Sequence, residues 1–197
     1  MTQNLTARRR AAVAGLMGAG MLLTACAADG PPDPSGDDPG VLESHGLDGL
    51  TGRELAEELD AAPVEERPTD LIASVEPDAV VVTDEQGQEE SVPLPEDEFY
   101  VSVAPYIDQT HDCFYHSLTT CLGELDNQEV DVTVTEEGTG EVLVDETLET
   151  YDNGFFGLWL PRGIDAEMTI EHEGLSSTTS LSTGEGDPTC LTTSRLS

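Results

Sequence analysis

The stretch VDVTVTEEGTGEVLVDETLETYDNGFFGLWL, residues 130–160, carries the pattern that decides the fold. Apolar and polar residues alternate in its β-prone runs, and the turn Asp152-Asn153-Gly154 precedes the last run. Successive side chains of a strand point to opposite faces of a sheet, so this alternation predicts half-buried strands. The core of the resulting sheets is expected to include the large apolar side chains of the last run, namely Phe155, Leu158, Trp159 and Leu160.

Comparable short runs occur on both sides of this stretch. They are LIASV (71–75), AVVVT (79–83), ESVPL (90–94) and FYVSVAPY (99–106) before it, and AEMTIEH (166–172), LSSTTSLST (175–183) and TCLTTSRL (189–196) after it. The first three are separated by the turn-like segments EPD and DEQGQE, which is typical of a small meander. The later runs, short and regularly spaced, favour a β-sandwich over a parallel sheet.

One short helix is expected before the strands. Thr51 and Glu54 form a capping box, in which the threonine side chain accepts from an unpaired amide and the glutamate reaches back. Leu55 and Leu59 share one helical face, so the helix is expected to run to about Asp60. The predicted fold is therefore mainly β, α+β overall, with a helix-plus-meander region over 46–110 and a sandwich domain over 111–197.

The first 25 residues indicate export. Arg8, Arg9 and Arg10 precede a short apolar run, as in a secretory signal peptide. The run ends in Leu23-Thr24-Ala25-Cys26, which resembles the lipobox of bacterial lipoproteins, so Cys26 is the expected lipidation site. An ordinary signal peptide with a coincidental cysteine is the alternative. Residues 26–45, rich in Pro, Gly and Asp at their start, are expected to form a flexible tether. The protein is thus expected on the outer face of the cytoplasmic membrane or in the periplasm.

The charge excludes several partners. The whole chain has a net charge of −34, and the part after residue 25 has four arginines, no lysine and 41 acidic residues. Such a surface repels nucleic-acid phosphates and anionic headgroups. No nucleic-acid partner is therefore expected, and contact with a membrane is expected through the lipid anchor alone.

Two cysteines and two histidines gather in HDCFYHSLTTCLGEL, residues 111–125, and Cys190 lies near the C-terminus. Thiolate and imidazole ligands suit copper(I) and zinc better than calcium or magnesium. In an exported protein, however, a purely structural Cys113–Cys121 disulfide is an equally good interpretation. Three cysteines cannot all pair within one chain, so one is left free, bonded to another molecule or bound to a metal.

These residues resemble a known family. FYVSVAPYIDQTHDCFYHSLTTCLGEL, DNGFFGLWLPR and the distal DPTCLTT are similar to the CueP-type copper-binding proteins of the bacterial cell envelope. The resemblance extends from about residue 46 to the C-terminus, and its most specific part is H-x-C-x-x-H-S-L-T-x-C with a third cysteine near the end. The lipobox and the extreme acidity depart from the soluble members of that family.

The resemblance implies a function in copper tolerance. It implies copper binding through Cys113, Cys121 and Cys190, with copper(I) as the main bound metal, copper(II) as a second form and zinc as a less favoured occupant. It also implies reduction of copper(II), and transfer to an envelope protein or contact with a thiol reductase. We expect Cys113 and Cys121 to be a redox pair with Cys190 as the third ligand or resolving thiol. His116 and His111 are expected either to bind the metal directly or to hydrogen-bond its thiolate ligands.

Other functions remain as alternatives. An envelope-tethered thiol–disulfide oxidoreductase or isomerase would use the same cysteines, although the two-residue spacing of that class is absent from the sequence. An adhesion or ligand-binding sandwich would leave the cysteines unexplained. A hydrolase using Ser117 is disfavoured because no G-x-S-x-G motif is present. The expected protein is thus a metal-binding protein and not an enzyme.

Overall fold

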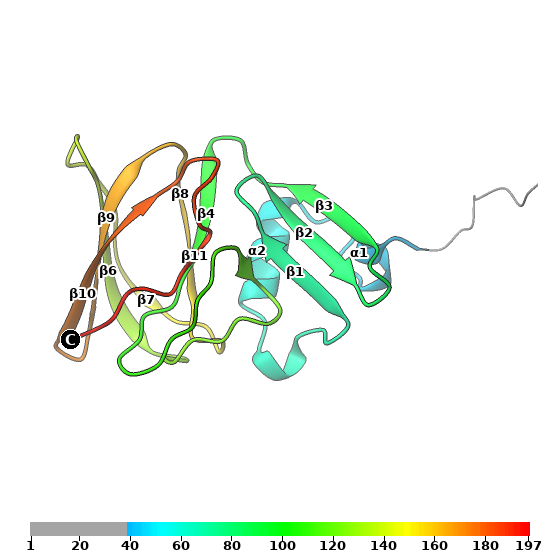
Figure 1. Cartoon of the computed structure of the whole chain (residues 1–197), viewed down its shortest axis with the longest axis horizontal. Coiled ribbons are helices and arrows are strands. Elements are labelled where there is room, and N and C mark those ends of the chain that lie inside the picture. The colour runs from blue at the N-terminus through cyan, green and yellow to red at the C-terminus, as the bar shows by residue number, and fades with distance from the viewer. Residues whose placement is uncertain (1–38) are drawn as a thin grey trace, which may run out of the picture. The chain divides into compact units, whose positions relative to one another are not determined.

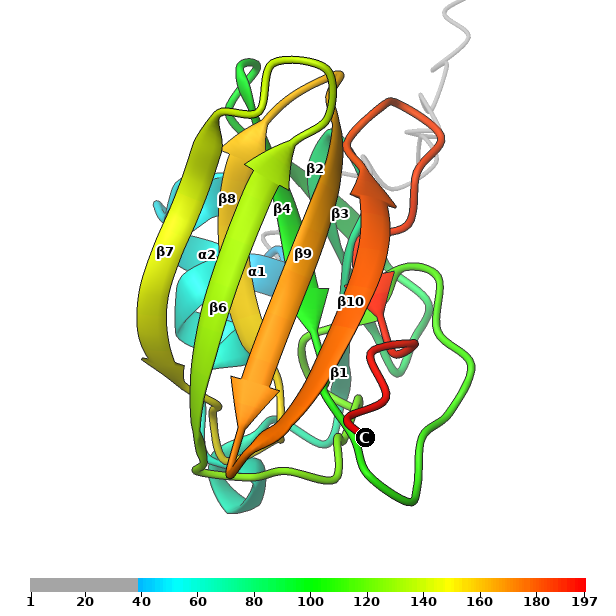
Figure 2. The ribbon, with the colours of Figure 1, turned by 90° about the vertical axis from the view of Figure 1, so that its left-hand side faces the viewer.

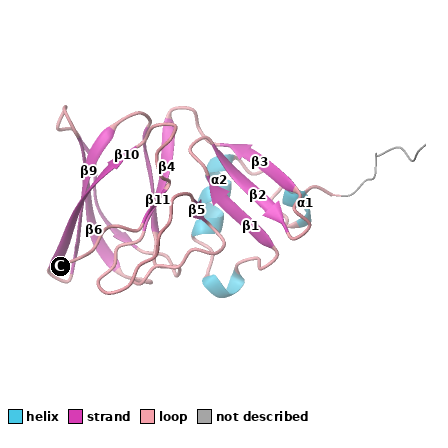
Figure 3. Ribbon diagram, viewed as in Figure 1, coloured by secondary structure: helices cyan, strands magenta, loops and turns pink. Residues whose placement is uncertain are grey.

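The computed structural model describes residues 39–197, which all belong to one compact unit (Figure 1). The expected signal peptide, Cys26 and the first part of the expected tether lie outside the described residues. Strands predominate, as the sequence predicted (Figure 3). Among residues 39–197, no helix is both long enough and apolar enough to cross a membrane.

The first half of this unit is a four-stranded sheet in the order β3-β2-β1-β5, packed on helix α2. Its strands are β1 (Leu71–Val75), β2 (Ala79–Asp84), β3 (Glu89–Pro93) and β5 (His116–Ser117). The predicted helix is confirmed as α2 (Gly52–Asp60), and both hydrogen bonds of the capping box are present. Leu55, Ala56 and Leu59 are the buried apolar residues of this helix, and they pack in one core with β1 and β2. A short 3-10 helix, η1 (Val64–Glu66), follows.

The second half is a sandwich of two sheets (Figure 2). One sheet has the order β10-β9-β6-β7, built from β6 (Glu129–Glu136), β7 (Val142–Glu149), β9 (Asp165–His172) and β10 (Leu175–Ser182). The other has the order β11-β4-β8, built from β4 (Glu98–Val103), β8 (Phe156–Pro161) and β11 (Cys190–Leu191). Alternate residues of the two sheets face each other and form one core, with Val130, Val132 and Val134 on β6 facing Phe99, Val101 and Val103 on β4.

The chain crosses between the two halves three times, from β3 to β4, from β4 to β5 and from β5 to β6, which departs from the predicted boundary at residue 110. Strand β4 precedes that boundary, yet it lies in the sandwich, antiparallel to β8. Strand β5 follows the boundary, yet it pairs with β1 of the meander, with Val75 opposite His116. The two halves are therefore joined by exchanged strands, with Cys113 in the second of these connections and Cys121 in the third.

The sequence predicts Trp159 in the sandwich core, and this prediction is wrong. Leu158 and Leu160 face that core, but Trp159, between them on β8, faces the opposite side and packs with the helix-and-meander cluster. Its ring lies 4.8 Å from the Tyr100 ring, tilted by 52°, and the Arg53 guanidinium lies over it at 4.0 Å. Trp159 therefore helps to fasten the two halves together.

The expected tether is also partly structured. Residues 41–44, placed in the tether by composition, form the short helix α1 (Val41–Ser44). The Glu90 carboxylate on β3 accepts hydrogen bonds from the amides of Val41 and Leu42. Val41 is 4% exposed and belongs to the meander core, so the folded unit begins earlier than the predicted residue 46.

Candidate metal centre

Four of the five predicted site residues converge at the junction of the two halves. Cys113, His116, Cys121 and Cys190 each offer one ligand atom, and these atoms all lie within 4.8 Å of one another. Cys113 and Cys121 come from the loops that flank β5, His116 from β5 itself and Cys190 from β11. Thiolate and imidazole donors at this spacing can hold a soft or borderline metal ion.

The disulfide in this structure differs from the pair that the spacing suggested. Cys113 is bonded to Cys190, with their Cα atoms 5.6 Å apart, and Cys121 is free. Cys121 Sγ nevertheless lies 3.7 Å from Cys113 Sγ. Because β11 runs parallel to β4 and opposite Ser102 and Val103, it brings residue 190 to the loop that follows β4. The Cys113–Cys190 pairing thus follows from a long-range strand contact that local spacing does not encode.

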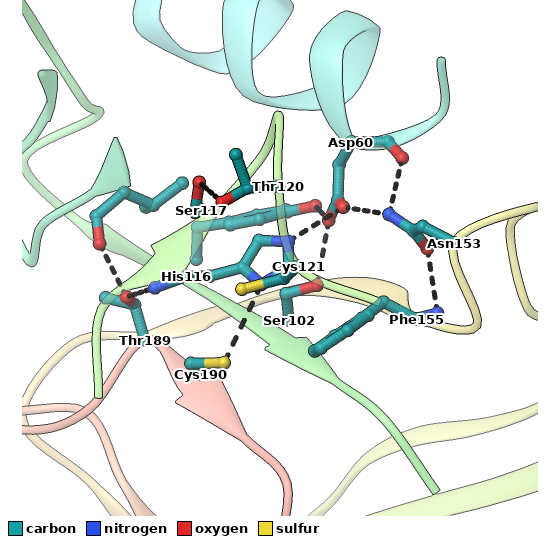
Figure 4. Close-up of polar contacts among 12 residues, drawn as sticks. Asp60, Ser102, His116, Ser117, Thr120, Cys121, Asn153, Phe155, Thr189 and Cys190 are labelled. Carbon is teal, nitrogen blue, oxygen red and sulfur yellow. Dashed lines mark hydrogen bonds and ion pairs between the residues drawn. The ribbon is translucent and has the colours of Figure 1, made fainter. Parts of the chain in front are cut away.

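Hydrogen bonds fix the position of His116 on its short strand. Its amide donates to Thr189 Oγ1 at 3.0 Å, and the Thr189 hydroxyl donates to the Val75 carbonyl at 2.5 Å. The Cys190 amide donates to the Phe114 carbonyl at 3.1 Å. These bonds tie β1, β5 and β11 together at the site, and the contact between His116 and Thr189 is drawn in Figure 4.

The His116 ring is completely buried between a carboxylate and the sulfur atoms. Nε2 lies 2.9 Å from Asp60 Oδ1, and Nδ1 lies 3.7 Å from Cys190 Sγ. The ring packs at 4.5 Å from the Phe155 ring. Phe155 is thus part of the apolar wall of the site, together with Ala104. The sequence-based prediction that it lies in the sandwich core is wrong.

Asp60 is a site residue that the sequence did not reveal. It closes helix α2 and is fully buried, where its Oδ2 accepts hydrogen bonds from the Tyr100 and Ser102 hydroxyls at 2.7 and 2.8 Å. Its Oδ1 accepts from His116 and from Asn153 Nδ2, which lies 2.9 Å away. In the sequence Asp60 only marks the end of a helix and Asn153 only a turn; nothing local connects either of them to His116.

The buried pair shifts two pKa values in opposite directions. Burial alone would lower the pKa of His116, but the charge and hydrogen bond of Asp60, with a smaller effect of Cys121, raise it to about 9. Burial alone would raise the pKa of Asp60, but His116 and the two hydroxyl donors hold it below its ordinary value. At neutral pH the pair is therefore an imidazolium facing a carboxylate.

The free thiol is activated by the same histidine. Burial raises the pKa of Cys121, but the hydrogen bond and charge of His116 outweigh it, so the pKa is lowered from 9.0. A thiolate is both the nucleophilic and the metal-binding form of cysteine. Cys121 is only half-buried and is not part of the disulfide, so it is the thiol at this site that is available to react.

Arg67 supplies a second cation at the site. Its side chain is buried, and Nη1 donates to the Cys121 carbonyl at 2.9 Å. Its Nε and Nη2 are buried without a hydrogen-bond partner among the described residues. Burial lowers the pKa of Arg67, and the negative charges of Asp60 and Cys121 oppose that shift. A buried guanidinium with spare donors is suited to stabilise negative charge on nearby sulfur.

The fifth predicted residue, His111, is not among the converging ligands. It packs at 6.2 Å from the Phe155 ring and lines a separate hollow of about 250 Å3 with Leu122 and Glu124. Its Nε2 is buried and has no partner among residues 39–197. The other two histidines lie away from the cluster, His45 near Asp70 and His172 bonded to the Glu129 carbonyl.

Two contacts hold the cysteine loops in place. The Glu124 carboxylate accepts hydrogen bonds from the amides of Ile107, Asp108 and Gln109, which clamps the start of the first loop. The Gly123 amide donates to the Asn153 carbonyl at 2.6 Å, which fixes the second loop beside the 151–154 turn. The sulfur positions are therefore set by the loop backbone as well as by strand pairing.

An exposed apolar rim is formed by the side chains that directly follow Cys113 and Cys121 in the chain. It consists of Phe114, Tyr115 and Leu122, whose exposed fractions are 53%, 40% and 53%. The Phe114 and Tyr115 rings contact each other edge to face at 5.0 Å. Large exposed apolar side chains grouped around a reactive site are typical of a contact surface.

Comparisons with known proteins agree with this geometry. The family model described as "Periplasmic copper-binding protein CueP" matches residues 54–195. A solved structure described as "Crystal Structure of S.CueP" is 35% identical, with a TM-score of 0.73, over 79% of this chain and 94% of that chain. A search of curated proteins gave no match of significance.

Proposed function

This chain belongs to the CueP family of periplasmic copper-binding proteins, and from that premise we propose that it sequesters copper through Cys113, Cys121 and Cys190. The observation that carries the proposal is the convergence of these three sulfur atoms and a His116 nitrogen within 4.8 Å of one another. By this proposal, copper tolerance results from holding the ion outside the cytoplasm in a thiolate site.

Copper(I) is the metal that this donor set favours. Soft thiolate ligands select copper(I), and zinc is the competing occupant because it accepts the same donors. The apolar wall formed by Phe155 and Ala104 keeps water from one side of the cluster. Arg67 offsets the negative charge that a copper(I) ion with several thiolates retains, in a chain that has few other cations.

The same cysteines can reduce copper(II). Two thiolates each give one electron to one copper(II) ion, so two copper(I) ions and one disulfide are formed, with no other oxidant or reductant required. We propose that the Cys113–Cys190 bond is the oxidised product of that reaction. The redox pair originally expected, Cys113 with Cys121, shares Cys113 with it.

Thiol–disulfide exchange can connect the two pairings. The Cys121 thiolate attacks Cys113 Sγ, 3.7 Å away, forms a Cys113–Cys121 bond and releases Cys190 as a thiolate. The exchange consumes no electrons. It only changes which cysteine is the free thiol, from the half-buried Cys121 to the buried Cys190. Cys190, which is 2% exposed, is then available only to an ion already within the site.

A protein partner is proposed at the apolar rim. Copper(I) binding by all three cysteines requires the disulfide to be reduced, and Cys113, which is followed by Phe114 and Tyr115, is its less buried member. We propose that a thiol reductase or a copper-receiving envelope protein contacts this rim. The lipid anchor at Cys26 would hold the site outside the cytoplasmic membrane.

The alternative function is a thiol–disulfide oxidoreductase, favoured by the free Cys121 next to a disulfide. Reduction of insulin by the reduced protein separates the two functions. A dedicated copper site should show little turnover in this assay.

The direct test is an anaerobic titration of the fully reduced protein with copper(I) in the presence of a competing chelator. We expect tight stoichiometric binding, lost in a Cys113→Ser, Cys121→Ser, Cys190→Ser triple variant. A matched control replaces Ser91, on the distant strand β3, with alanine and should leave binding unchanged. Equal binding by the triple variant would exclude the cysteines as the site, and displacement of copper(I) by equimolar zinc would reassign the metal.

A further inference from the structure

We propose that Asp60 is a positioning residue that fixes the proton of His116 on Nε2 and so directs Nδ1 to copper. The inference rests on the proposed copper site, and it assigns a task to a side chain that lies 56 positions from His116 in the sequence. It specifies which of the two imidazole nitrogens binds the metal.

The first step is the orientation of the Asn153 amide. The Phe155 amide donates to Asn153 Oδ1 at 2.8 Å, so the oxygen of that side chain is already in use as an acceptor. Asn153 Nδ2 must then be the end that faces Asp60, where it lies 3.0 Å from the carbonyl and 2.9 Å from Oδ1. Asp60 Oδ1 is therefore an acceptor.

The second step counts the hydrogen bonds of the carboxylate. Its two oxygens receive four contacts, two hydroxyls on Oδ2 and the groups of Asn153 and His116 on Oδ1. An ionised carboxylate offers about four lone-pair positions and no donor, so all of them are occupied here. Because a carboxylate can only accept, His116 Nε2 must carry a hydrogen atom.

The third step follows from the ring. Copper(I) binding displaces the Nδ1 proton of the imidazolium to solvent, and the neutral ring that remains carries its one proton on Nε2 and its lone pair on Nδ1. Nδ1 is the nitrogen that faces the sulfur atoms, 3.7 Å from Cys190 Sγ, here part of the disulfide (Figure 4). A carboxylate that holds the far nitrogen of a ligating histidine in this way fixes the tautomer and the ring orientation.

Burial makes this arrangement rigid. Both side chains of the pair are 0% exposed, so water does not compete for either end of the contact. Asp60 ends helix α2, which is packed against β1 and β2, so the position of the carboxylate is set by the meander half. Asp60 therefore holds the His116 ring, and with it the metal-binding nitrogen, in a fixed position relative to helix α2.

The test is nitrogen NMR of histidine-labelled, reduced protein with and without copper(I), which is diamagnetic. In the loaded protein we expect the His116 Nδ1 resonance to shift to that of a metal-bound nitrogen, while Nε2 retains its proton. Copper(I) binding with Nε2 as the shifted nitrogen, or with neither His116 nitrogen shifted, would overturn the inference and leave the cysteine site intact. Absence of tight copper(I) binding would instead overturn the proposed function, and this inference with it.

A variant provides the second measurement. Asp60→Asn retains the shape of the side chain but replaces one acceptor oxygen by a donor, so it cannot satisfy all four contacts. We expect copper(I) affinity to fall about 10- to 100-fold, with both His116 tautomers visible by NMR. Asp84→Asn makes the same change at the end of strand β2, where the carboxylate accepts from the Gln86 amide, and should alter neither the affinity nor the tautomer. Wild-type affinity and a single Nε2–H tautomer in folded Asp60→Asn protein would contradict the assignment.

Discussion

Cys121 Sγ lies 3.7 Å from Cys113 Sγ, the less buried sulfur of the Cys113–Cys190 disulfide. Cys113 is therefore adjacent to two possible partners at once, Cys121 in the loop after β5 and Cys190 on the buried strand β11. The three sulfur atoms and His116 form one cluster whose bonding can change while its framework of strands stays in place.

The first prediction concerns the disulfide pairing. Under mild oxidation, Cys190→Ser should form a Cys113–Cys121 bond, because the two sulfur atoms are already near contact distance. Cys121→Ser should retain the Cys113–Cys190 bond of the parent protein. Peptide mapping by mass spectrometry after alkylation identifies the disulfide-bonded cysteines in both variants. If Cys113 and Cys121 are both fully alkylated in oxidised Cys190→Ser protein, exchange between the pairings is excluded.

The second prediction concerns pH and the buried pair. The pKa of His116 is raised from 6.5 to about 9, so its contribution to stability is complete below pH 6.5 and is lost as the pH rises from there to about 9. The pKa of Asp60 is lowered from 3.8, so its contribution is present above pH 3.8 and is lost as the pH falls through the folded-state pKa. The pair should therefore stabilise the fold most between about pH 4 and pH 6.5.

The measurement is urea unfolding from pH 4 to pH 9 for the wild type and His116→Gln. The difference between their free energies of unfolding should shrink above pH 6.5. A constant difference across this range would show that the imidazolium does not contribute. The comparison removes the general repulsion among acidic residues, because that repulsion acts on both proteins alike.

The third prediction concerns the loss of one partner of that pair. Asp60→Ala leaves the His116 ring buried without its carboxylate, and the Tyr100 and Ser102 hydroxyls without an acceptor. Breaking a buried pair in this way costs about 3–5 kcal/mol. Chemical denaturation measures this value, and a loss below about 1 kcal/mol would indicate that water replaces the carboxylate.

Much of the fold could be predicted from the sequence because its signals are local. The capping box of Thr51 and Glu54 fixes the start of α2, and alternation places Val130, Val132 and Val134 on one face of β6. The sequence predicts Trp159 in the sandwich core, but its side chain is on the other face of β8. Alternation puts Trp159 opposite Leu158, but only the packing of α2 across β4 and β8 determines what covers that second face.

The metal site was predictable in its residue types and not in its connections. Cys113, His116 and Cys121 lie close together in the sequence, Cys190 joins them as the remaining cysteine once Cys26 is assigned to the lipid, and the family resemblance implies copper. The Cys113–Cys190 bond depends on parallel pairing of β11 with β4, which no local pattern encodes. Asp60 could not be found because it reaches the site by tertiary packing of a helix end.

The fourth prediction concerns the close approach of two glycines. A Cβ at Gly154, where φ is +77°, would lie 2.7 Å from the Gly123 carbonyl carbon. Gly154→Ala should therefore destabilise the fold by about 2–3 kcal/mol and weaken copper(I) binding, because Gly123 follows Cys121 closely in the same loop. Gly138→Ala is the matched control, with a φ of +87° but no atom within 4 Å. Equal losses in the two variants would show that backbone strain alone, and not the contact, is responsible.

The fifth prediction concerns the buried arginine. Arg67→Met removes the positive charge and the spare donors beside Cys121, so copper(I) affinity should fall by about tenfold, or 1.4 kcal/mol. Arg195→Met removes the same charge from an exposed position and should have little effect, because exposed charges are screened. Competition titrations with a chelator measure both variants. An equal response of the two variants would point to net charge rather than to the local guanidinium.

The most direct test of the copper site is X-ray absorption spectroscopy at the copper edge of reduced protein loaded with one equivalent of copper(I). The proposed site predicts a first coordination sphere of sulfur ligands with one imidazole nitrogen, and loss of the sulfur scattering in the Cys113→Ser, Cys121→Ser, Cys190→Ser variant. A coordination sphere of nitrogen and oxygen alone in the wild-type protein would contradict it.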